Sequence, residues 1–139
     1  CILMTTKVFV NGTFDLLHRG HLELLNYAKS LGDRVYVGID SDRRVAEMKG
    51  DSRPIYNMED RKFFLQNLKS VHRVAVFDND SQLAAMVEFI KPQIMVVGSD
   101  WKNKTVIGSM SAAKLVFFDR VGDYATTKTV QSIIDRANL

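Results

Sequence analysis

Residues 7–21 have the sequence KVFVNGTFDLLHRGH, in which a short apolar run passes directly into a glycine-containing turn. Lys7–Asn11 is rich in branched apolar residues, which is typical of a buried strand. The turn is followed by a helical pattern of apolar residues, formed by Leu22, Leu24, Leu25, Ala28 and Leu31. A strand that leads through a turn into a helix is the repeating unit of α/β folds.

The rest of the chain repeats this alternation. Apolar runs predict further strands at Arg34–Ile39, Arg73–Phe77, Ile94–Gly98 and Lys114–Phe118. Helical patterns lie between or after them, at Phe63, Phe64, Leu65 and Leu68, at Leu83, Ala84, Met86, Val87 and Ile90, and at Val130, Ile133 and Ile134. Because the strands are apolar nearly throughout, both faces of the sheet should be covered. We therefore predict one α/β domain over residues 1–139, with a doubly wound sheet of five parallel strands.

Composition and charge narrow the function classes. A chain of 139 residues with 46% hydrophobic residues is expected to form one globular core. Its formal charge of +3 comes from 19 basic and 16 acidic residues without a basic run, so we expect no nucleic-acid partner. No stretch approaches the roughly 20 apolar residues of a membrane span, so no membrane partner is expected.

The cysteine count indicates the cellular compartment, and the first residues raise the question of the natural start. The single cysteine, Cys1, has no partner within the chain, which favours a reducing, cytoplasmic compartment. Residues 1–6 are expected to be a disordered or cloning-derived N-terminus, with Met4 as a candidate natural start.

The turn at residues 12–21 is suited to anion binding. Ligands of doubly wound sheets bind outside the carboxyl ends of the strands, where this turn lies. A helix N-terminus offers free N–H groups, and Gly12 and Gly20 would allow close backbone approach to a ligand. His18 and His21, three residues apart, can each donate an imidazole N–H to oxygens that gain charge in a transition state.

Other interpretations of the two histidines remain open at this point. One histidine could pack locally while the other is a surface residue. A zinc pair is a second alternative, although no third Cys or His stands nearby at ligand spacing. Neither alternative explains the flanking glycines. The chain also lacks the G-x-G-x-x-G dinucleotide fingerprint after a strand and the G-x-x-x-x-G-K-[ST] P-loop.

Gly12-Thr13-Phe14-Asp15 with His18-x-Gly20-His21 resembles the GTFD and HxGH signature of the cytidylyltransferase-like nucleotidyltransferases, a superfamily with a Rossmann-like sheet. The resemblance extends over nearly the whole chain. Lys49-Gly50-x-x-Arg53-Pro54 falls where the family has a mobile lysine loop, and Glu59-x-Arg61 falls where it has a helix-borne arginine. Gly98-Ser99-Asp100-Trp101 follows the fourth strand.

The segment Arg120–Lys128 resembles the RTEGISTTK signature of glycerol-3-phosphate cytidylyltransferase. Val121, Gly122, Asp123 and Ala125 replace the Thr, Glu, Gly and Ser of that signature. Ala125 loses a hydroxyl, and Asp123 adds a negative charge near the expected phosphates.

The resemblance implies a role for each matching residue. The catalytic residues would be His18, His21, Lys49 and Arg120. The nucleotide would be bound by Gly12, Thr13, Phe14, Asp15, Gly20, Gly98, Thr126 and Thr127. The acceptor would be bound by Asp40, Arg61, Asp100 and Trp101. Asp15 is expected to order the turn rather than to react, because a triphosphate would repel a reactive carboxylate.

Several of these residues also have a plain structural interpretation. Lys49 alone would be a solvated surface lysine, and Trp101 could belong to the core. Arg61 either binds a phosphate or pairs with Glu59 or Asp60. Asp42 could hold the mobile loop or could simply cap a helix. The structural alternative for Thr126 and Thr127 is an N-cap of the last helix.

The implied reaction transfers a nucleoside monophosphate from an NTP to a phosphorylated sugar or polyol and releases pyrophosphate. The acceptor phosphate is already mostly dianionic at neutral pH, so no general base is required. Mg²⁺ is expected to bind through the NTP phosphates, without a metal site on the protein. By resemblance to small members of the family, we also expect a homodimer.

Two subfamilies with different substrates each resemble part of this sequence. Lys49-Gly50-x-x-Arg53-Pro54 and Val106-Ile107-Gly108-Ser109 are more similar to adenylyltransferases that act on heptose 1-phosphate, which is the leading prediction. Arg120 with Thr126-Thr127-Lys128, and Asp100-Trp101, are more similar to glycerol-3-phosphate cytidylyltransferase, which would use CTP and make CDP-glycerol. A hypothesis from another class is a nucleotide-binding module without catalysis.

Overall fold

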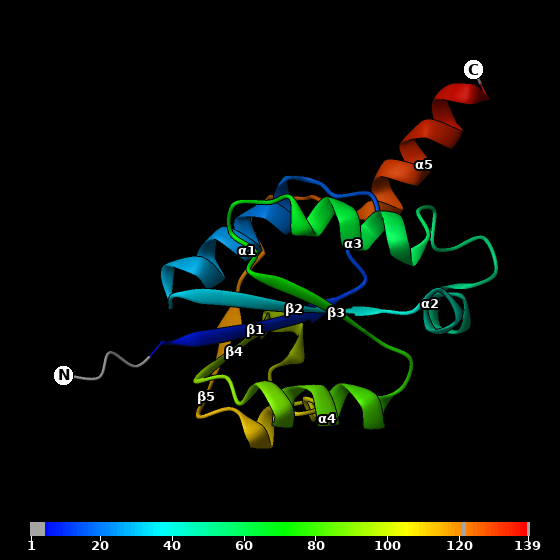
Figure 1. Cartoon of the computed structure of the whole chain (residues 1–139). Helices are drawn as coiled ribbons and strands as arrows, with labels where there is room; N and C mark the ends of the chain where they lie inside the picture. Colours follow the sequence, from blue (N-terminus) through cyan, green and yellow to red (C-terminus); the bar gives the residue numbers. More distant parts are fainter. Residues whose placement is uncertain (1–4, 121, 139) are drawn as a thin grey trace.

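The computed structural model describes residues 5–120 and 122–138, in which strands and helices alternate (Figure 1). The strands are β1 (Lys7–Gly12), β2 (Arg34–Asp40), β3 (Arg73–Phe77), β4 (Ile94–Gly98) and β5 (Lys114–Phe118). The α-helices are α1 (Arg19–Ser30), α2 (Asp42–Lys49), α3 (Met58–Gln66), α4 (Asp80–Ile90) and α5 (Thr126–Ala137). Two short 3₁₀ helices, η1 (Ser99–Trp101) and η2 (Ser109–Ser111), follow β4. The five predicted strands are confirmed to within one residue at their ends.

The strands form one parallel sheet in the order β3-β2-β1-β4-β5. In its register Lys7 lies opposite Arg34, and Val8 lies opposite Ile94. Helices α1 and α3 cover one face of the sheet and α4 covers the other (Figure 1). The predicted Rossmann-like, doubly wound architecture is therefore confirmed. The strand order reverses direction between β1 and β4, and a ligand crevice is expected beside such a reversal, outside the carboxyl ends of the strands.

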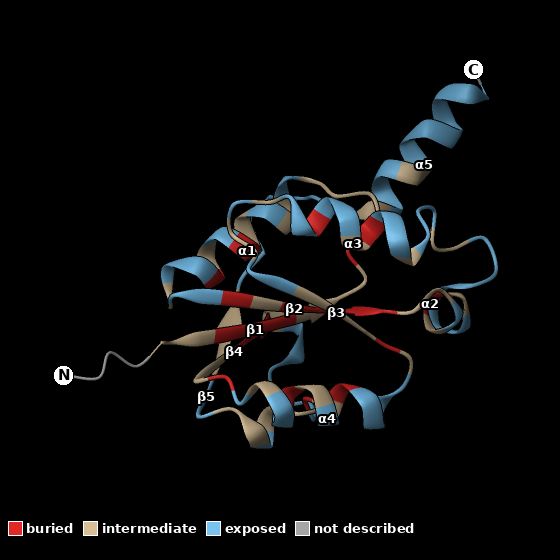
Figure 2. Cartoon of the chain, in the orientation of Figure 1, coloured by how far each residue is buried: buried red, intermediate tan, exposed pale blue. Residues whose placement is uncertain are grey.

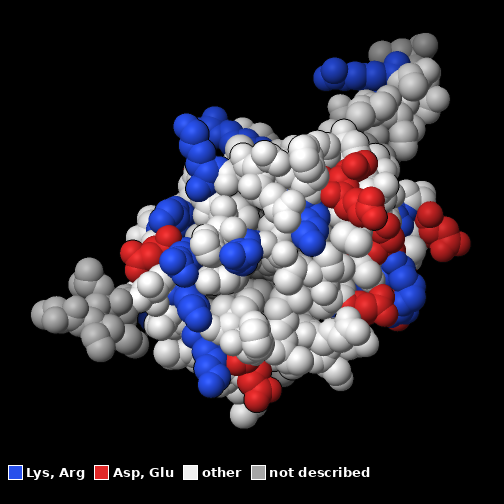
Figure 3. Space-filling view, in the orientation of Figure 1, with Lys and Arg blue, Asp and Glu red and all other residues white. Residues whose placement is uncertain are grey.

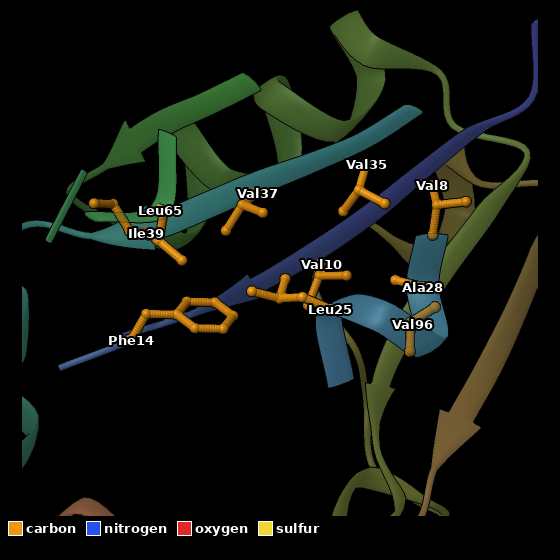
Figure 4. Packing of buried hydrophobic residues seen from close by; sticks show 10 residues of the cluster. All are labelled: Val8, Val10, Phe14, Leu25, Ala28, Val35, Val37, Ile39, Leu65 and Val96. Atoms are coloured by element: carbon orange, nitrogen blue, oxygen red, sulfur yellow. The ribbon is translucent and has the colours of Figure 1, made fainter. Parts of the chain in front are cut away.

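The core has a layer on each face of the sheet, because successive strand residues point in opposite directions. Figure 2 shows the buried residues concentrated along the strands and on the helix sides that face them. On one face Val8 and Val10 pack with Leu25 of α1 and Leu65 of α3 (Figure 4). On the other face Phe9 packs with residues of β4 and α4. Full burial of such a side chain stabilises the fold by about 1.5–3 kcal/mol.

Side chains that precede three of the helices cap them. The side-chain oxygens of Ser41, Asn57 and Asn79 accept hydrogen bonds from main-chain N–H groups in the first turns of α2, α3 and α4. Helix α2 was not predicted, because it buries only Val45 and so has no apolar repeat. Lys49, expected in a loop, is instead the last residue of this helix.

Helix α5 differs from the others. It begins after Ala125, which has no side-chain hydrogen bond to the first turn, so the expectation that Thr126 and Thr127 cap this helix is wrong. Figure 1 shows α5 projecting away from the sheet, and Figure 2 shows it exposed along most of its length. Ile133 and Ile134 on it are 61% and 46% exposed.

Part of the expected N-terminal disorder can be compared with the structure. Residues 1–4 lie outside the described residues, as does Val121 among the departures from the family signature. Thr6, however, is well held: its N–H donates to the carboxylate of Asp33 at 2.8 Å, and its carbonyl oxygen accepts from the N–H of Asp33 at 2.8 Å. The expectation of a disordered or cloning-derived segment at residues 1–6 stays a prediction, and these bonds tie Thr6 to the residue that precedes β2.

The surface carries charges of both signs. Figure 3 shows Lys and Arg side chains interspersed with Asp and Glu on the face seen there. Several of these charges pair, as where Arg43 contacts both Asp78 and Glu47. Within residues 5–120 and 122–138, none of the helices has the length and apolar character needed to cross a membrane.

Candidate active site

The turn after β1 has an uncommon backbone conformation. Phe14 and Leu16 have φ angles of 53° and 47°, in the left-handed region that few residues other than glycine adopt. The ring of Phe14 is buried in the core (Figure 4), which compensates part of the cost. Such strained positions cluster at functional sites, and here they fix the orientation of Asp15 between them.

Asp15 joins three separate segments of the chain. It is only 3% exposed, and its two carboxylate oxygens accept hydrogen bonds from the N–H groups of Ile55 at 2.6 Å and Tyr56 at 2.9 Å. Its main-chain oxygen accepts a hydrogen bond from the hydroxyl of Thr126 at 2.7 Å. Asp15 thus holds the segment between α2 and α3, and the start of α5, against the turn. Its carboxylate is occupied by these contacts, in keeping with a role in ordering the chain.

His18 and His21 lie together at the N-terminus of α1. His18 is the N-cap residue, and its main-chain N–H donates to Nδ1 of His21 at 3.2 Å. Because Nδ1 accepts this bond, the neutral imidazole of His21 carries its proton on Nε2. The ring of His18 stacks on that of His21, with centroids 3.9 Å apart, and its Nδ1 is buried without a hydrogen-bond partner among the described residues.

The environment keeps both imidazoles neutral. Burial is the main cause that lowers the pKa of His21 to about 4, and the proximity of His18 and Lys49, which disfavours a second positive charge, adds to it against the opposing effect of Asp15. Burial also lowers the pKa of His18, and the charge of Arg120 lowers it further. At neutral pH each imidazole therefore offers one N–H as a hydrogen-bond donor without carrying a positive charge.

The two glycines of the motif make room for side chains of the protein itself. A Cβ atom on Gly20 would lie 2.9 Å from the imidazole of His18 and 3.2 Å from Cβ of Tyr124. A Cβ atom on Gly12 would lie 3.0 Å from the ring of Phe14. These glycines therefore admit the rings that build the site, and Gly20 also lines the cavity described below, so close approach of a ligand to its backbone stays a prediction.

A cavity of about 330 Å³ lies in front of the histidines. His18 and His21 line it after β1, Gly98 lines it at the end of β4, and it therefore lies at the reversal of strand order. Lys49, Arg120 and the first residues of α5 complete its polar lining. The first N–H groups of a helix have no partner within the helix, so the N-terminus of α5 adds further donors. No acidic side chain from the described residues lines the cavity, which is therefore suited to a polyanion.

The two long cations of the cavity differ in their surroundings. Burial lowers the pKa of Lys49, and the charge of Arg53 lowers it further, whereas Asp40 and Asp15 act in the opposite direction. Arg120 is exposed, and its guanidinium donates to the carboxylate of Asp100 at 2.9 Å. An exposed ion pair of this kind contributes at most about 1 kcal/mol, so a ligand phosphate can displace it at low cost.

Three other predicted residues lie behind or beside the cavity. The hydroxyl of Thr13 donates to one carboxylate oxygen of Asp40 at 3.2 Å, and Arg44 donates to the other at 2.8 Å. Asp40 is only 5% exposed, so in this structure it supports the turn and does not face an acceptor. Trp101 is 48% exposed, with the amine of Lys104 over its ring, and it does not line the cavity.

Arg61 has a different position from the one expected. Its side chain is fully buried, and it donates to the main-chain oxygens of Tyr56 and Thr13 and to the carboxylate of Asp42. The expectation that it pairs with Glu59 or Asp60 is wrong, and its guanidinium is closed off from an acceptor. Asp42 is correspondingly the ion-pair partner of Arg61, while Ser41 caps α2. We therefore assign Arg61 a structural role.

Sequence reasoning missed the aromatic lining of the cavity. Tyr124 and Phe118 both line it, and the ring of Tyr124 lies nearly parallel to that of His18 with centroids 6.1 Å apart. The only signal for Tyr124 was its place inside the segment Arg120–Lys128. Nothing in its residue type indicates that it supports a histidine 106 positions earlier in the chain.

Comparison with known proteins places this site in a family. The model of the cytidylyltransferase-like family matches residues 9–132. The bifunctional protein HldE of Helicobacter pylori strain P12 is 43% identical over 91% of this chain and 27% of its own length. HldE of Sulfurimonas denitrificans is 44% identical over 91% of this chain and 26% of its own length. The chain thus spans about a quarter of the length of these relatives.

Solved structures agree with this assignment. A lipopolysaccharide core biosynthesis protein from Thermoplasma volcanium superposes with a TM-score of 0.65 at 26% identity, covering 88% of this chain and 100% of that one. A protein of unknown function from Archaeoglobus fulgidus has a TM-score of 0.61 at 20% identity over 86% of this chain and 94% of that one, which shows a shared fold alone. The motif, the fold and the match to residues 9–132 together show that this chain belongs to the cytidylyltransferase-like family of nucleotidyltransferases.

Proposed function

We propose that this chain transfers the adenylyl group of ATP to a heptose 1-phosphate-like sugar phosphate and releases pyrophosphate. The observation that supports this most directly is the convergence of two neutral imidazoles, Lys49, Arg120 and the N-terminus of α5 on one cavity. This set of groups consists of donors and cations, and a nucleoside triphosphate with a phosphorylated acceptor is the complementary pair of ligands.

The chemistry requires one bond to form and one to break. An oxygen of the acceptor phosphate attacks the α-phosphorus of ATP, and the bond from that phosphorus to the oxygen it shares with the β-phosphorus breaks. The attacking phosphate is already mostly dianionic, since its second pKa is about 6, so no proton has to be removed. This explains how the site can function without a free carboxylate or other general base.

Each group has a role in that step. Nε2–H of His21 and an N–H of His18 donate to oxygens of the α-phosphate as charge develops there. Lys49 holds the attacking phosphate near the α-phosphorus, and Arg120 with the N-terminus of α5 holds the β- and γ-phosphates that depart. Catalysis would then consist of positioning and electrostatic stabilisation.

Magnesium enters this scheme as part of the substrate. The polar side chains of the described residues that line the cavity are imidazoles, cations and hydroxyls without a carboxylate, which fits an anion better than a cation. Across residues 5–120 and 122–138, His, Cys, Asp and Glu side chains form no group of three or more that is arranged to hold a metal ion. We therefore propose that Mg²⁺ arrives bound to the triphosphate and keeps water as its remaining ligands.

The acceptor side of the site involves Asp100. When the acceptor or the triphosphate takes over Arg120, the carboxylate of Asp100 becomes free to accept hydrogen bonds from acceptor hydroxyls. The similarity of Lys49–Pro54 and Val106–Ser109 to heptose-directed adenylyltransferases supports a sugar phosphate as that acceptor. The 43–44% identity to HldE proteins and the fold shared with a lipopolysaccharide core biosynthesis protein are in line with this choice.

The test is pyrophosphate release in the presence of Mg²⁺, with ATP or CTP crossed with heptose 1-phosphate or glycerol 3-phosphate. Turnover with ATP and heptose 1-phosphate supports the proposal. Turnover only with CTP and glycerol 3-phosphate would show the second candidate activity, that of a glycerol-3-phosphate cytidylyltransferase, which the Arg120–Lys128 segment favours. Tight nucleotide binding without pyrophosphate release in any combination would indicate a non-catalytic nucleotide-binding module.

We also propose that the chain forms a homodimer, as expected for small members of its family. Helix α5 supports this, because it projects from the body (Figure 1) and its Ile133 and Ile134 side chains are exposed. Light scattering over a range of concentrations tests the proposal. A molar mass of twice 15.8 kDa is expected, and a monomer at every concentration contradicts it.

A further inference from the structure

The segment between α2 and α3 reaches across to the start of α5. Nη2 of Arg53 donates to the hydroxyl of Thr127 at 3.0 Å, and Thr127 lines the cavity. The two residues are 74 positions apart, so this contact depends on the fold. Arg53 itself does not line the cavity in this structure, but its guanidinium lies one hydrogen bond away from a residue that does.

The backbone around Arg53 is anchored. The N–H groups of Ile55 and Tyr56, two and three residues further on, are bound by the carboxylate of Asp15. Asp15 belongs to the turn that also presents His18 and His21. The position of Arg53 is therefore set relative to the histidines, although the side chain itself remains partly exposed and can turn.

Among the described residues, Arg53 and the neighbouring Lys49 are two cations without a carboxylate in direct contact, although Asp40 and Asp15 lie near Lys49. The charge of Arg53 lowers the pKa of Lys49, which shows that the two cations lie near one another. Within the part of the chain that the structure describes, no carboxylate forms an ion pair with either of them. The positive end of the α5 dipole lies beside Thr127 and adds to the same field. Bringing these positive groups together has a cost that an anionic ligand would offset.

We propose that Arg53 is a nucleotide-binding residue whose guanidinium contacts the β- and γ-phosphates, the part of ATP that leaves as pyrophosphate. This inference rests on the proposed function. In the structure the guanidinium is held by the neutral hydroxyl of Thr127, which is a weaker partner than a phosphate oxygen. A small rotation of the Arg53 side chain would replace the Thr127 hydroxyl with a phosphate oxygen as its partner. This exchange would take place at the N-terminus of α5, where the departing phosphates are expected. Arg53 would then neutralise charge on pyrophosphate together with Arg120.

Equilibrium binding of Mg–ATP, Mg–ADP and AMP to the native chain and to Arg53→Ala tests the assignment. A hydrogen bond to a charged group corresponds to a loss of roughly 10- to 100-fold in affinity. We expect a loss of that size for ATP, a smaller one for ADP and a change of less than about twofold for AMP, which has no β- or γ-phosphate. Arg53→Lys keeps the charge but loses the planar fork, and should give an intermediate loss.

A matched control removes an equal charge elsewhere. Arg73 is exposed at the amino end of β3, at the opposite end of the sheet from the cavity. Arg73→Ala should leave all three affinities unchanged, which shows that net charge is not the cause. Thermal unfolding of each variant checks that it is folded, and Arg53→Gln replaces Arg53→Ala if the latter is not.

The possible outcomes separate this inference from the proposed function. Equal losses for ATP, ADP and AMP would mean that Arg53 only holds its own segment, and would overturn the assignment. Unchanged affinities in Arg53→Ala, with native binding and turnover, would overturn the assignment alone. A native chain that binds none of the three nucleotides would overturn the proposed function, and this inference with it.

Discussion

The imidazole rings of His18 and His21 lie stacked, with their centroids 3.9 Å apart and their planes inclined by 23°. The hydrogen bond from the main chain of His18 to Nδ1 of His21 fixes the second ring, and the ring of Tyr124 lies beside the first. These contacts fix the orientation of both imidazole rings. The pair is therefore best regarded as one preorganised donor unit for a phosphate.

Replacing either histidine with alanine should remove a donor that acts mainly in the transition state. We expect kcat to fall by about 10²- to 10³-fold in His18→Ala and in His21→Ala, with a smaller effect on the KM for ATP. Steady-state pyrophosphate release measures both constants. The double variant should lose less than the product of the two single losses, because the rings act together. Single variants that are folded and retain kcat within about tenfold would contradict the assigned role.

The low pKa of His21 predicts how stability depends on pH. In the folded chain this imidazole is neutral down to about pH 4, whereas in the unfolded chain it takes up a proton near pH 6.5. The unfolded state thus binds more protons between these values, so the free energy of unfolding should fall as the pH is lowered from about 6.5 to 4. Chemical denaturation at several pH values measures this slope. His21→Gln should have a shallower slope than the native chain, and identical slopes would show that the native imidazole is not shielded.

Asp15 should matter for the segment between α2 and α3. Asp15→Ala leaves the N–H groups of Ile55 and Tyr56 without their acceptor, and should destabilise the chain by about 1–3 kcal/mol. Hydrogen exchange at these two amides should accelerate, and the KM for ATP should rise if the segment supports the nucleotide. Asp51→Ala is the control, because Asp51 is exposed in the same segment. Unaltered exchange at both amides in Asp15→Ala would refute the anchoring role.

Arg61 should contribute to stability and not to acceptor binding. Arg61→Met leaves the carbonyl oxygens of Thr13 and Tyr56 and the carboxylate of Asp42 without their donor, at a cost of about 3 kcal/mol. Denaturant unfolding measures this loss, and Arg73→Met serves as the exposed control. The KM for the acceptor should be unchanged in the folded variant. A raised KM at native stability would instead restore the acceptor contact suggested by the sequence.

The fold could be predicted because its determinants are local. Each strand is a continuous apolar run, and α1 and α4 each bury apolar residues at helical spacing, such as Leu83 and Val87. Helix α3 was predicted from an apolar pattern of which it buries Leu65, whereas Phe63 and Phe64 are exposed. Helix α2 escaped prediction because only Val45 is buried, so its residues resemble a charged loop. The start of α5 was misjudged because Thr126 donates its hydroxyl to Asp15, 111 positions away, and does not cap its own helix.

The candidate site divides in the same way. His18 and His21 are neighbours in sequence directly after a strand, so the pattern alone places them at the carboxyl edge of the sheet. The occupation of Asp40 by Thr13, and of Arg61 by Asp42, depends on contacts between elements that are 27 and 19 residues apart. Such contacts carry no periodic signal. Asp40 and Arg61, which were predicted to bind the acceptor, have structural roles instead because each is hydrogen-bonded to a residue of another element.

The measurement that tests the central claim most directly is ³¹P NMR of the reaction products formed from Mg–ATP and heptose 1-phosphate. The account predicts that the phosphate signal of the sugar is replaced by the coupled pair of a phosphoanhydride, in equal amount with pyrophosphate, and that neither forms with His18→Ala on the same timescale. Formation of ADP and inorganic phosphate would contradict attack at the α-phosphorus. Unchanged ATP with bound nucleotide on the protein would contradict the claim that this site transfers a nucleotide.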